Sequence, residues 1–207
     1  MASTSRRVFT VGHSNHPTTK FLDLLRRHAV TTIADVRSAP YSQFAPQFSK
    51  EPLRRTLKAE GIKYAFLGHE LGARSTDPAC YENGRVQYDR LAQTDLFQVG
   101  IGRLVNGSDS ECIAILCTEK DPLDCHRTLL VARALIERGL AAEHILADGA
   151  LESYEDSMLR LLDKTGQAPP DFFTTDDERI NKALREQEAR IAYVDRELER
   201  TSDGTKA

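Results

Sequence analysis

The strongest constraint on the fold is a strand, a helix and a second strand that follow one another near the start of the chain. Residues 8–12 are apolar and β-branched and end in glycine, which is typical of a buried strand that feeds a loop. Residues 18–28 repeat apolar side chains at helical spacing, and residues 31–36 have the composition of a strand. Because such a unit normally joins parallel strands by a right-handed crossover, it predicts a parallel sheet.

The same alternation continues along the chain. Further strands are expected at residues 62–67, 112–117 and 144–147. Further helices are expected from near Pro52 to Gly61, at 94–105, at 125–138 with Asp124 as its N-cap, and at 151–162. The sequence therefore predicts an α/β fold, with a mostly parallel sheet, helices on both faces and a Rossmann-like three-layer arrangement.

The composition changes towards the C-terminus. Residues 1–168 are expected to form the α/β domain, and residues 169–207 a linker and an amphipathic helix that begins at a capping box, Thr175-Asp-Asp-Glu178. The helix spaces its seam by four and three, at Ile180, Leu184, Gln187, Ile191, Val194 and Leu198. This seam either lies across the parent domain or forms a short coiled coil that makes a homodimer. In both cases we expect the helix to lie outside the active site.

The bulk properties bound the class of protein. The 207 residues carry a net charge of −3 and 4 cysteines, and no apolar run approaches the roughly 20 residues of a membrane span. We expect a cytoplasmic protein with reduced thiols and no membrane partner. Nucleic-acid binding would need a local basic patch. One candidate combines basic and aromatic residues: Lys50, Arg54, Arg55 and Lys58 with Tyr41, Phe44 and Phe48. The alternative for this patch is a solvated helix face with aromatics in the core.

Polar segments follow three of the expected strands. Ligands bind beyond the carboxyl ends of parallel strands, so these segments are expected to form one site. The candidate catalytic residues are Cys125, His126, His13 and Glu119. The candidate substrate-binding residues are Asp35, Arg37, Ser38, Ser14, Arg127 and Cys117.

Cys125 is expected in the first turn of a helix, where free N–H groups, the helix dipole and the adjacent His126 and Arg127 favour a thiolate. It is either a nucleophile or an inert packed thiol. Cys117 is either packed or a resolving or ligating thiol. Glu119 is a catalytic acid or a solvated carboxylate. Asp35 and Arg37 form a structural ion pair, or Arg37 binds an anion.

Metal and cofactor chemistry has little support in the sequence. Seven residues separate Cys117 from Cys125, where zinc sites commonly have two to four, so a metal site with His126 and His13 is only weakly indicated. No metal ligand is assigned and no cofactor is predicted. Gly100-Ile-Gly102 lacks the third glycine of a dinucleotide fingerprint, and no cysteine is followed six positions later by arginine.

Several segments together resemble the family of domain of unknown function 488. They are 10–14 with 21–25, 33–40, 64–72, 116–119 and 125–127, and the likeness covers about residues 6–165. The sequence departs from the family at Ala73, where another glycine is expected. The resemblance implies a compact α/β fold and a shared polar site but no settled activity, although some members are labelled as related to DNA repair.

Two functions are compatible with these features. The first is an enzyme that acts on a small anionic metabolite, nucleotide or modified base. Cys125 would be its nucleophile, His126 or His13 its acid and base, and Arg37 and Arg127 its anion-binding groups. The second is a non-catalytic module that binds a nucleotide or nucleic acid, with an association to DNA repair. In that case the arginines hold phosphate and the thiols are structural.

Overall fold

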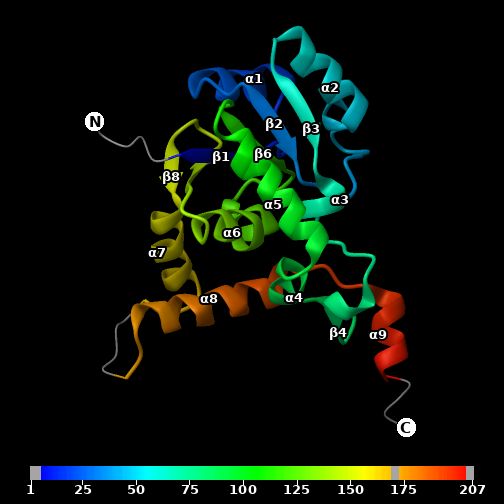
Figure 1. Cartoon of the computed structure of the whole chain (residues 1–207), viewed down its shortest axis with the longest axis vertical. Helices are drawn as coiled ribbons and strands as arrows, with labels where there is room; N and C mark the ends of the chain where they lie inside the picture. Colours follow the sequence, from blue (N-terminus) through cyan, green and yellow to red (C-terminus); the bar gives the residue numbers. More distant parts are fainter. Residues whose placement is uncertain (1–5, 169–172, 204–207) are drawn as a thin grey trace.

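The computed structural model describes residues 6–168 and 173–203, and its elements are labelled in Figure 1. The linker prolines Pro169 and Pro170 lie outside the described residues. One main sheet has the strand order β3-β2-β6-β1-β7-β8. Its strands are β1 (Arg7–Gly12), β2 (Thr32–Asp35), β3 (Lys63–Phe66), β6 (Ile113–Cys117), β7 (Ala141–Ile145) and β8 (Leu151–Ser153).

The parallel sheet predicted from the sequence is confirmed. β1 pairs in parallel with both β6 and β7, and β2 pairs in parallel with both β3 and β6. β2, β6 and β1 are therefore neighbours, and their carboxyl ends meet at one edge. The three polar segments that follow these strands leave the sheet at that edge, as expected.

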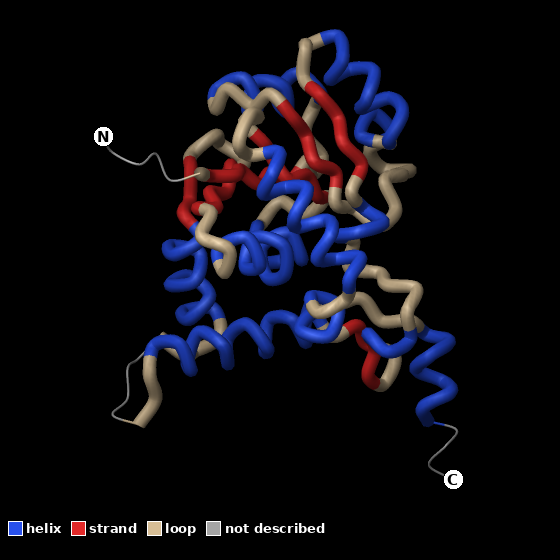
Figure 2. Tube along the Cα trace, in the orientation of Figure 1, coloured by secondary structure: helices blue, strands red, loops and turns tan. Residues whose placement is uncertain are grey.

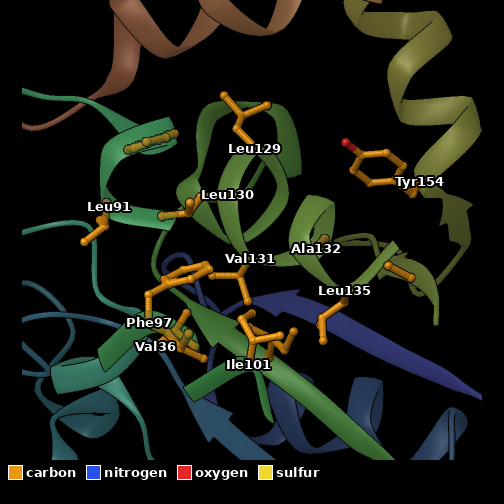
Figure 3. Packing of buried hydrophobic residues seen from close by; sticks show 14 of the residues in the cluster. Val36, Leu91, Phe97, Ile101, Leu129, Leu130, Val131, Ala132, Leu135 and Tyr154 are labelled. Atoms are coloured by element: carbon orange, nitrogen blue, oxygen red, sulfur yellow. The ribbon is translucent and has the colours of Figure 1, made fainter. Parts of the chain in front are cut away.

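Helices cover both faces of the sheet, which confirms the three-layer arrangement. On β1, Phe9 and Val11 pack towards one core cluster and Val8 towards the other, because successive side chains point to opposite faces. The first cluster lies under α1 (Thr18–Arg27) and α2 (Lys50–Ala59). The second cluster lies under α5 (Asp95–Gly107) and α7 (Tyr154–Lys164). It also lies under the helical residues 127–136, which follow β6 in the chain. Figure 3 shows part of this second cluster, with Phe97 and Ile101 of α5 facing Val131 and Leu135.

The sequence misplaced the edge of the sheet. The expected strand at 144–147 is β7, which begins earlier, and Leu151 begins β8 rather than a helix. β8 is antiparallel to β7, so the sheet is parallel except at this edge. The turn between them places Gly149 at a φ of 90°. α7 starts at Tyr154, where the Ser153 side chain accepts the N–H of Asp156.

The helix expected at 125–138 is not regular. A 3-10 turn, η3 (Pro122–Asp124), is followed by a π-helical segment, η4 (Arg127–Ala132), and by α6 (Arg133–Ile136). Asp124 is not the N-cap. Its carboxylate contacts Lys164 and Gln187, and the 3-10 turn is capped by Asp121, which accepts the N–H of Leu123.

The long polar segment between β3 and α5 contains short elements. They are α3 (Gly68–Leu71), η2 (Pro78–Cys80), the hairpin β4 (Tyr81–Glu82) and β5 (Arg85–Val86), and α4 (Tyr88–Ala92). A short 3-10 turn, η1 (Pro46–Phe48), precedes α2. Figure 2 shows the small hairpin set apart from the main sheet, next to the C-terminal helices.

The C-terminal region forms two helices instead of one. α8 (Asp176–Ile191) begins at the expected capping box, and α9 (Arg196–Asp203) follows a break. At the break, the N–H of Val86 donates to the carbonyl of Tyr193, so the link extends the hairpin. Leu184 and Gln187 are buried within this chain, where the Gln187 amide donates to the carbonyl of Leu123. α8 runs across the parent domain (Figure 1), and the burial of these two seam residues agrees with the first of the two expected arrangements. Among the described residues, none of the helices combines the length and apolar character needed to cross a membrane.

Candidate functional site

A cavity of about 210 Å³ lies over the carboxyl ends of β2 and β6. Six of the predicted site residues line it: Arg37, Ser38, Cys117, Glu119, Cys125 and His126. Four others do not: His13, Ser14, Asp35 and Arg127. The predicted site is therefore divided between side chains that reach the cavity and side chains that support them.

Asp35, Arg37, His13 and Tyr64 form a buried group that we call the arginine network. The Asp35 carboxylate accepts the Nε and NH2 groups of Arg37 at 2.8 and 2.6 Å, and the Tyr64 hydroxyl at 2.7 Å. Arg37 also donates from NH1 to Nε2 of His13 at 3.1 Å. Of the five N–H groups on a guanidinium, three are used in this way, and Arg37 also lines the cavity.

His13 holds Arg37 in place through a hydrogen bond. A guanidinium only donates, so Nε2 of His13 must accept, and the proton is on Nδ1, which donates to the Ser14 carbonyl at 2.8 Å. The ring stacks on Phe48, with centroids 4.5 Å apart. Burial, partly offset by the hydrogen bond to Ser14, lowers the pKa of His13 to about 4, so the ring is neutral at pH 7. This geometry supports a positioning role for His13.

Ser14, a predicted ligand-binding residue, takes part in the turn after β1 and not in the cavity. Its φ is 47°, in the left-handed region that non-glycine residues seldom adopt. The hydroxyl donates to the Asn15 side chain at 3.4 Å, and the backbone N–H donates to the carbonyl of Thr118. The residue therefore links the turn to the segment that follows β6.

Cys117, Cys125, His126 and Glu119 form a second group, which we call the thiol cluster. Cys117 ends β6, and Cys125 immediately precedes the helical segment that starts at His126. Nδ1 of His126 lies 3.7 Å from Sγ of Cys117 and 3.9 Å from Sγ of Cys125. Sγ of Cys125 is 2.9 Å from a carboxylate oxygen of Glu119, so these two groups share a proton. The sequence did not establish that the two sulfurs meet; the fold brings them together.

Cys125 occupies the capping position that the sequence assigned to Asp124. Its backbone is extended, its carbonyl accepts the N–H of Thr128, and its sulfur accepts the N–H of Arg127 at 3.4 Å. The sulfur therefore lies at the positive end of the helix, as expected. Burial acts to raise the pKa of Cys125, but hydrogen bonding to Cys117, the charge of Arg127 and contact with His126 hold it well below its ordinary value.

The pKa values of the groups around Cys125 shift in the opposite direction, upwards. Hydrogen bonding to Cys125 and burial raise the pKa of Cys117, and burial together with the charge of Cys125 raises that of Glu119. Burial acts to lower the pKa of His126, but contact with Cys125 raises it overall. These shifts favour the thiolate form of Cys125 and the protonated forms of its neighbours.

Arg127 holds the loop that carries Glu119 and does not face the cavity. The buried guanidinium donates to the backbone carbonyls of Glu119 and Lys120 at 2.7 and 3.4 Å, and to the Thr10 hydroxyl at 3.3 Å. Gly12 packs against the same loop, since a Cβ there would lie 1.9 Å from the Glu119 carbonyl oxygen. The predicted anion-binding role of Arg127 is thus replaced by a structural one in this geometry.

Residues that were not predicted as site residues form the remaining walls. They are Ala39, Ala73, Arg74, Tyr88, Thr118, Asp124, Ile191 and Tyr193. The guanidinium of Arg74 lies 4.6 Å from the centre of the Tyr193 ring, and its backbone N–H donates to the Ser38 hydroxyl. Ile191 and Tyr193 belong to the C-terminal region, so the expectation that this region lies outside the site is wrong. Arg74 comes two residues after the segment 64–72, which resembles the family, and this closeness in sequence was the one indication that Arg74 belongs to the site.

The thiol cluster also has the composition of a metal site. The ligand atoms of Cys117, Cys125 and His126 all lie within 4.8 Å of one another. His13, the fourth ligand considered from the sequence, is committed to Arg37 and Ser14. The residues that can hold a metal ion are thus two thiols and one imidazole.

Comparison with known proteins gives one result. The family model of Domain of unknown function DUF488 matches residues 17–134, which is more than half of the chain. The matched part includes the Asp35–Arg37 pair and the whole thiol cluster, whereas the Gly12–Ser14 turn precedes it. Neither the comparison with curated proteins nor the comparison with solved structures gave a match. The chain belongs to the family described as Domain of unknown function DUF488.

Proposed function

We propose that this chain is an enzyme that transforms a small anionic molecule in the cavity, with Cys125 as its nucleophile. The observation that carries the proposal is the position of the Cys125 sulfur. It lines the cavity at a helix N-terminus, accepts a backbone N–H and lies within 3.9 Å of His126. Such surroundings stabilise a thiolate, which is the reactive form of cysteine.

Arg37, His126 and Glu119, which also line the cavity, have roles in this chemistry. The two N–H groups of Arg37 that are not used by Asp35 and His13 bind the anionic part of the substrate. The thiolate attacks an electrophilic carbon, and the bond to the leaving group breaks. The leaving group takes a proton from His126 or Glu119. Water or an acceptor molecule then releases the product and restores the thiolate. A reducing compartment such as the cytoplasm would keep these thiols free.

Alkylation of the metal-free protein tests the nucleophile. The rate would be measured for each cysteine by mass spectrometry, with Cys112 as the internal control. Cys112 is the more exposed of the two, and burial raises its pKa. Exposure alone therefore predicts faster alkylation of Cys112, whereas a Cys125 thiolate predicts that Cys125 reacts at least about tenfold faster at pH 7. Faster alkylation of Cys112 would contradict the proposal.

The charge of the reagent tests the substrate class. Iodoacetate and iodoacetamide have similar sizes but differ by one negative charge. We expect the ratio of their rates, iodoacetate over iodoacetamide, to be higher at Cys125 than at Cys112, because Arg37 and Arg74 line the cavity. Arg74→Gln should lower that ratio by about threefold, and the exposed position of Arg74 makes a folding defect unexpected. An equal ratio at both cysteines would rule out anion selection.

A second candidate function rests on a separate surface. Phe44 is 100% exposed and Tyr41 is 72% exposed, close in sequence to the exposed Arg54, Arg55 and Lys58 of α2. Aromatic rings and basic groups together can stack bases and contact phosphates of single-stranded nucleic acid. Phe48, the third aromatic, is buried and supports His13 instead.

Anisotropy of a labelled single-stranded oligonucleotide tests this candidate. Phe44→Ala should weaken binding about tenfold, whereas Phe173→Ala, at a ring that is 94% exposed in the C-terminal region, should not. Affinity that falls steeply with salt and differs between these variants would support the binding module. Equal affinities would remove it.

A further inference from the structure

The spacing of the thiol cluster is not explained by hydrogen bonds alone. Nδ1 of His126 is nearly equidistant from two sulfurs, at 3.7 and 3.9 Å. One ring nitrogen has a single proton or a single lone pair, so it can make a good hydrogen bond to only one of them. Because both sulfurs lie at nearly the same distance from this nitrogen, all three atoms can face a single point between them.

A tetrahedral metal ion accounts for this arrangement. Zinc lies about 2.3 Å from thiolate sulfur and about 2.0–2.1 Å from imidazole nitrogen, which keeps sulfur and nitrogen roughly 3.6 Å apart. The two observed separations are close to this value, and all three atoms fall within 4.8 Å of one another. Two thiolates would also neutralise the charge of a divalent ion.

The surroundings orient the imidazole as a ligand. Nε2 of His126 lies 3.2 Å from the carbonyl oxygen of Val36. A carbonyl only accepts, so Nε2 carries a proton, and when a metal displaces the second proton the lone pair is on Nδ1, which faces the sulfurs. Metal-binding histidines characteristically donate their second ring N–H in this way.

We infer that Cys117, Cys125 and His126 bind one thiophilic divalent cation of the zinc type, with its fourth position open to the cavity. Two soft sulfurs and an imidazole favour zinc over magnesium or calcium. A Cys125 sulfur bound to the metal cannot act as a free nucleophile, so occupancy would mask the chemistry proposed above. Only this masking rests on the proposed function; the binding itself does not.

Titration of the metal-depleted full chain with Cd²⁺ tests the site. The readout is the thiolate-to-metal charge-transfer absorbance, with competition by Zn²⁺ to measure affinity. We expect saturation at one equivalent. Cys117→Ser and Cys125→Ser should each weaken binding at least about 100-fold, whereas Cys112→Ser, which removes a thiol outside the cluster, should leave it unchanged. Absence of the absorbance in the wild-type chain, or equal affinity in all three variants, would overturn the inference.

Alkylation with and without one equivalent of Zn²⁺ separates the two proposals. We expect Zn²⁺ to slow alkylation of Cys125 at least about tenfold and to leave Cys112 unaffected. Rapid alkylation of the metal-free protein without any metal binding would overturn the metal site and support the nucleophile. Tight binding combined with slow alkylation of the metal-free protein would overturn the nucleophile and support the metal site.

Discussion

The arginine network and the thiol cluster lie side by side at one edge of the sheet but differ in how their polar groups are paired. In the arginine network, both carboxylate oxygens of Asp35 accept hydrogen bonds, and both ring nitrogens of His13 have a partner. In the thiol cluster, two sulfurs face one imidazole nitrogen, and Cys125 shares a proton with Glu119.

This difference suggests that the arginine network mainly stabilises the fold, whereas the thiol cluster is the reactive part of the site. A buried group whose hydrogen bonds are satisfied is rigid, and breaking it costs stability. A cluster whose protons are shared unequally has a group with a lowered pKa, which is a feature of reactive sites. Mutations in the arginine network should therefore reduce stability, and changes at the thiol cluster should mainly affect reactivity and metal binding.

The largest effect is expected from breaking the arginine network. Asp35→Asn removes the charge that pairs with the buried Arg37 and should lower the free energy of unfolding by about 3–5 kcal/mol, measured in urea. Asp23→Asn, at an exposed ion pair with Arg26, is the matched control and should cost less than about 1 kcal/mol. Similar losses at both positions would mean that the network does not stabilise the fold.

The next largest loss of stability is expected from a change that displaces the loop carrying Glu119. In Gly12→Ala the new Cβ would lie 1.9 Å from the Glu119 carbonyl oxygen, so the loop must move. We expect a loss of about 1–3 kcal/mol in unfolding free energy and slower alkylation of Cys125. Gly102→Ala, where no atom lies within 4 Å, should be neutral or stabilising. Unchanged stability and alkylation in Gly12→Ala would contradict the contact.

The pH dependence of stability sharpens the role of His13. Its pKa falls from 6.5 to about 4 on folding, so below pH 6.5 the unfolded chain binds a proton that the folded chain does not. Stability therefore falls as the pH decreases from 6.5 towards 4. Between pH 7 and pH 5, His13→Gln should lose about 2 kcal/mol less stability than the wild-type chain. Equal losses in the two proteins would show that burial does not keep His13 neutral in the folded chain.

The smallest effect on stability is expected at the cavity wall. Tyr193→Ala removes the ring that faces Arg74 and should cost about 0.5–1 kcal/mol in unfolding free energy. Because Tyr193 lines the cavity, the same variant should raise the alkylation rate of Cys125 about two- to threefold. Tyr41→Ala, at an exposed ring outside the cavity, serves as the control. If Cys125 is alkylated at the same rate in both variants, Tyr193 does not restrict access to the cavity.

The central part of the fold followed from local sequence patterns. The alternating strands and helices predicted the parallel sheet, and the sheet predicted that the segments after β1, β2 and β6 would meet. β8 was missed because three residues at an edge give a weak signal. The break between α8 and α9 was missed because it depends on hydrogen bonds to the β4–β5 hairpin, which are tertiary contacts.

Six of the ten site residues proposed from the sequence line the cavity, and the contacts that distinguish their roles could not be predicted. Spacing argued against a metal site at Cys117 and Cys125, because the sequence could not show that Arg127 holds the intervening loop by its carbonyls. That contact brings the loop back to the sheet. Likewise, an arginine beside a cysteine is compatible both with binding a ligand and with supporting a loop, and only the packing around Arg127 distinguishes the two.

The protonation state of Cys125 in the metal-free protein tests the central claim most directly. It can be measured as the ultraviolet thiolate absorbance that wild type has and Cys125→Ser lacks, followed as a function of pH. Our account predicts one thiolate at pH 7 that is lost only on acidification, while the difference between wild type and Cys112→Ser appears only above pH 9. If the Cys125 thiolate also forms only above pH 9, the thiol cluster does not activate Cys125 and the account is contradicted.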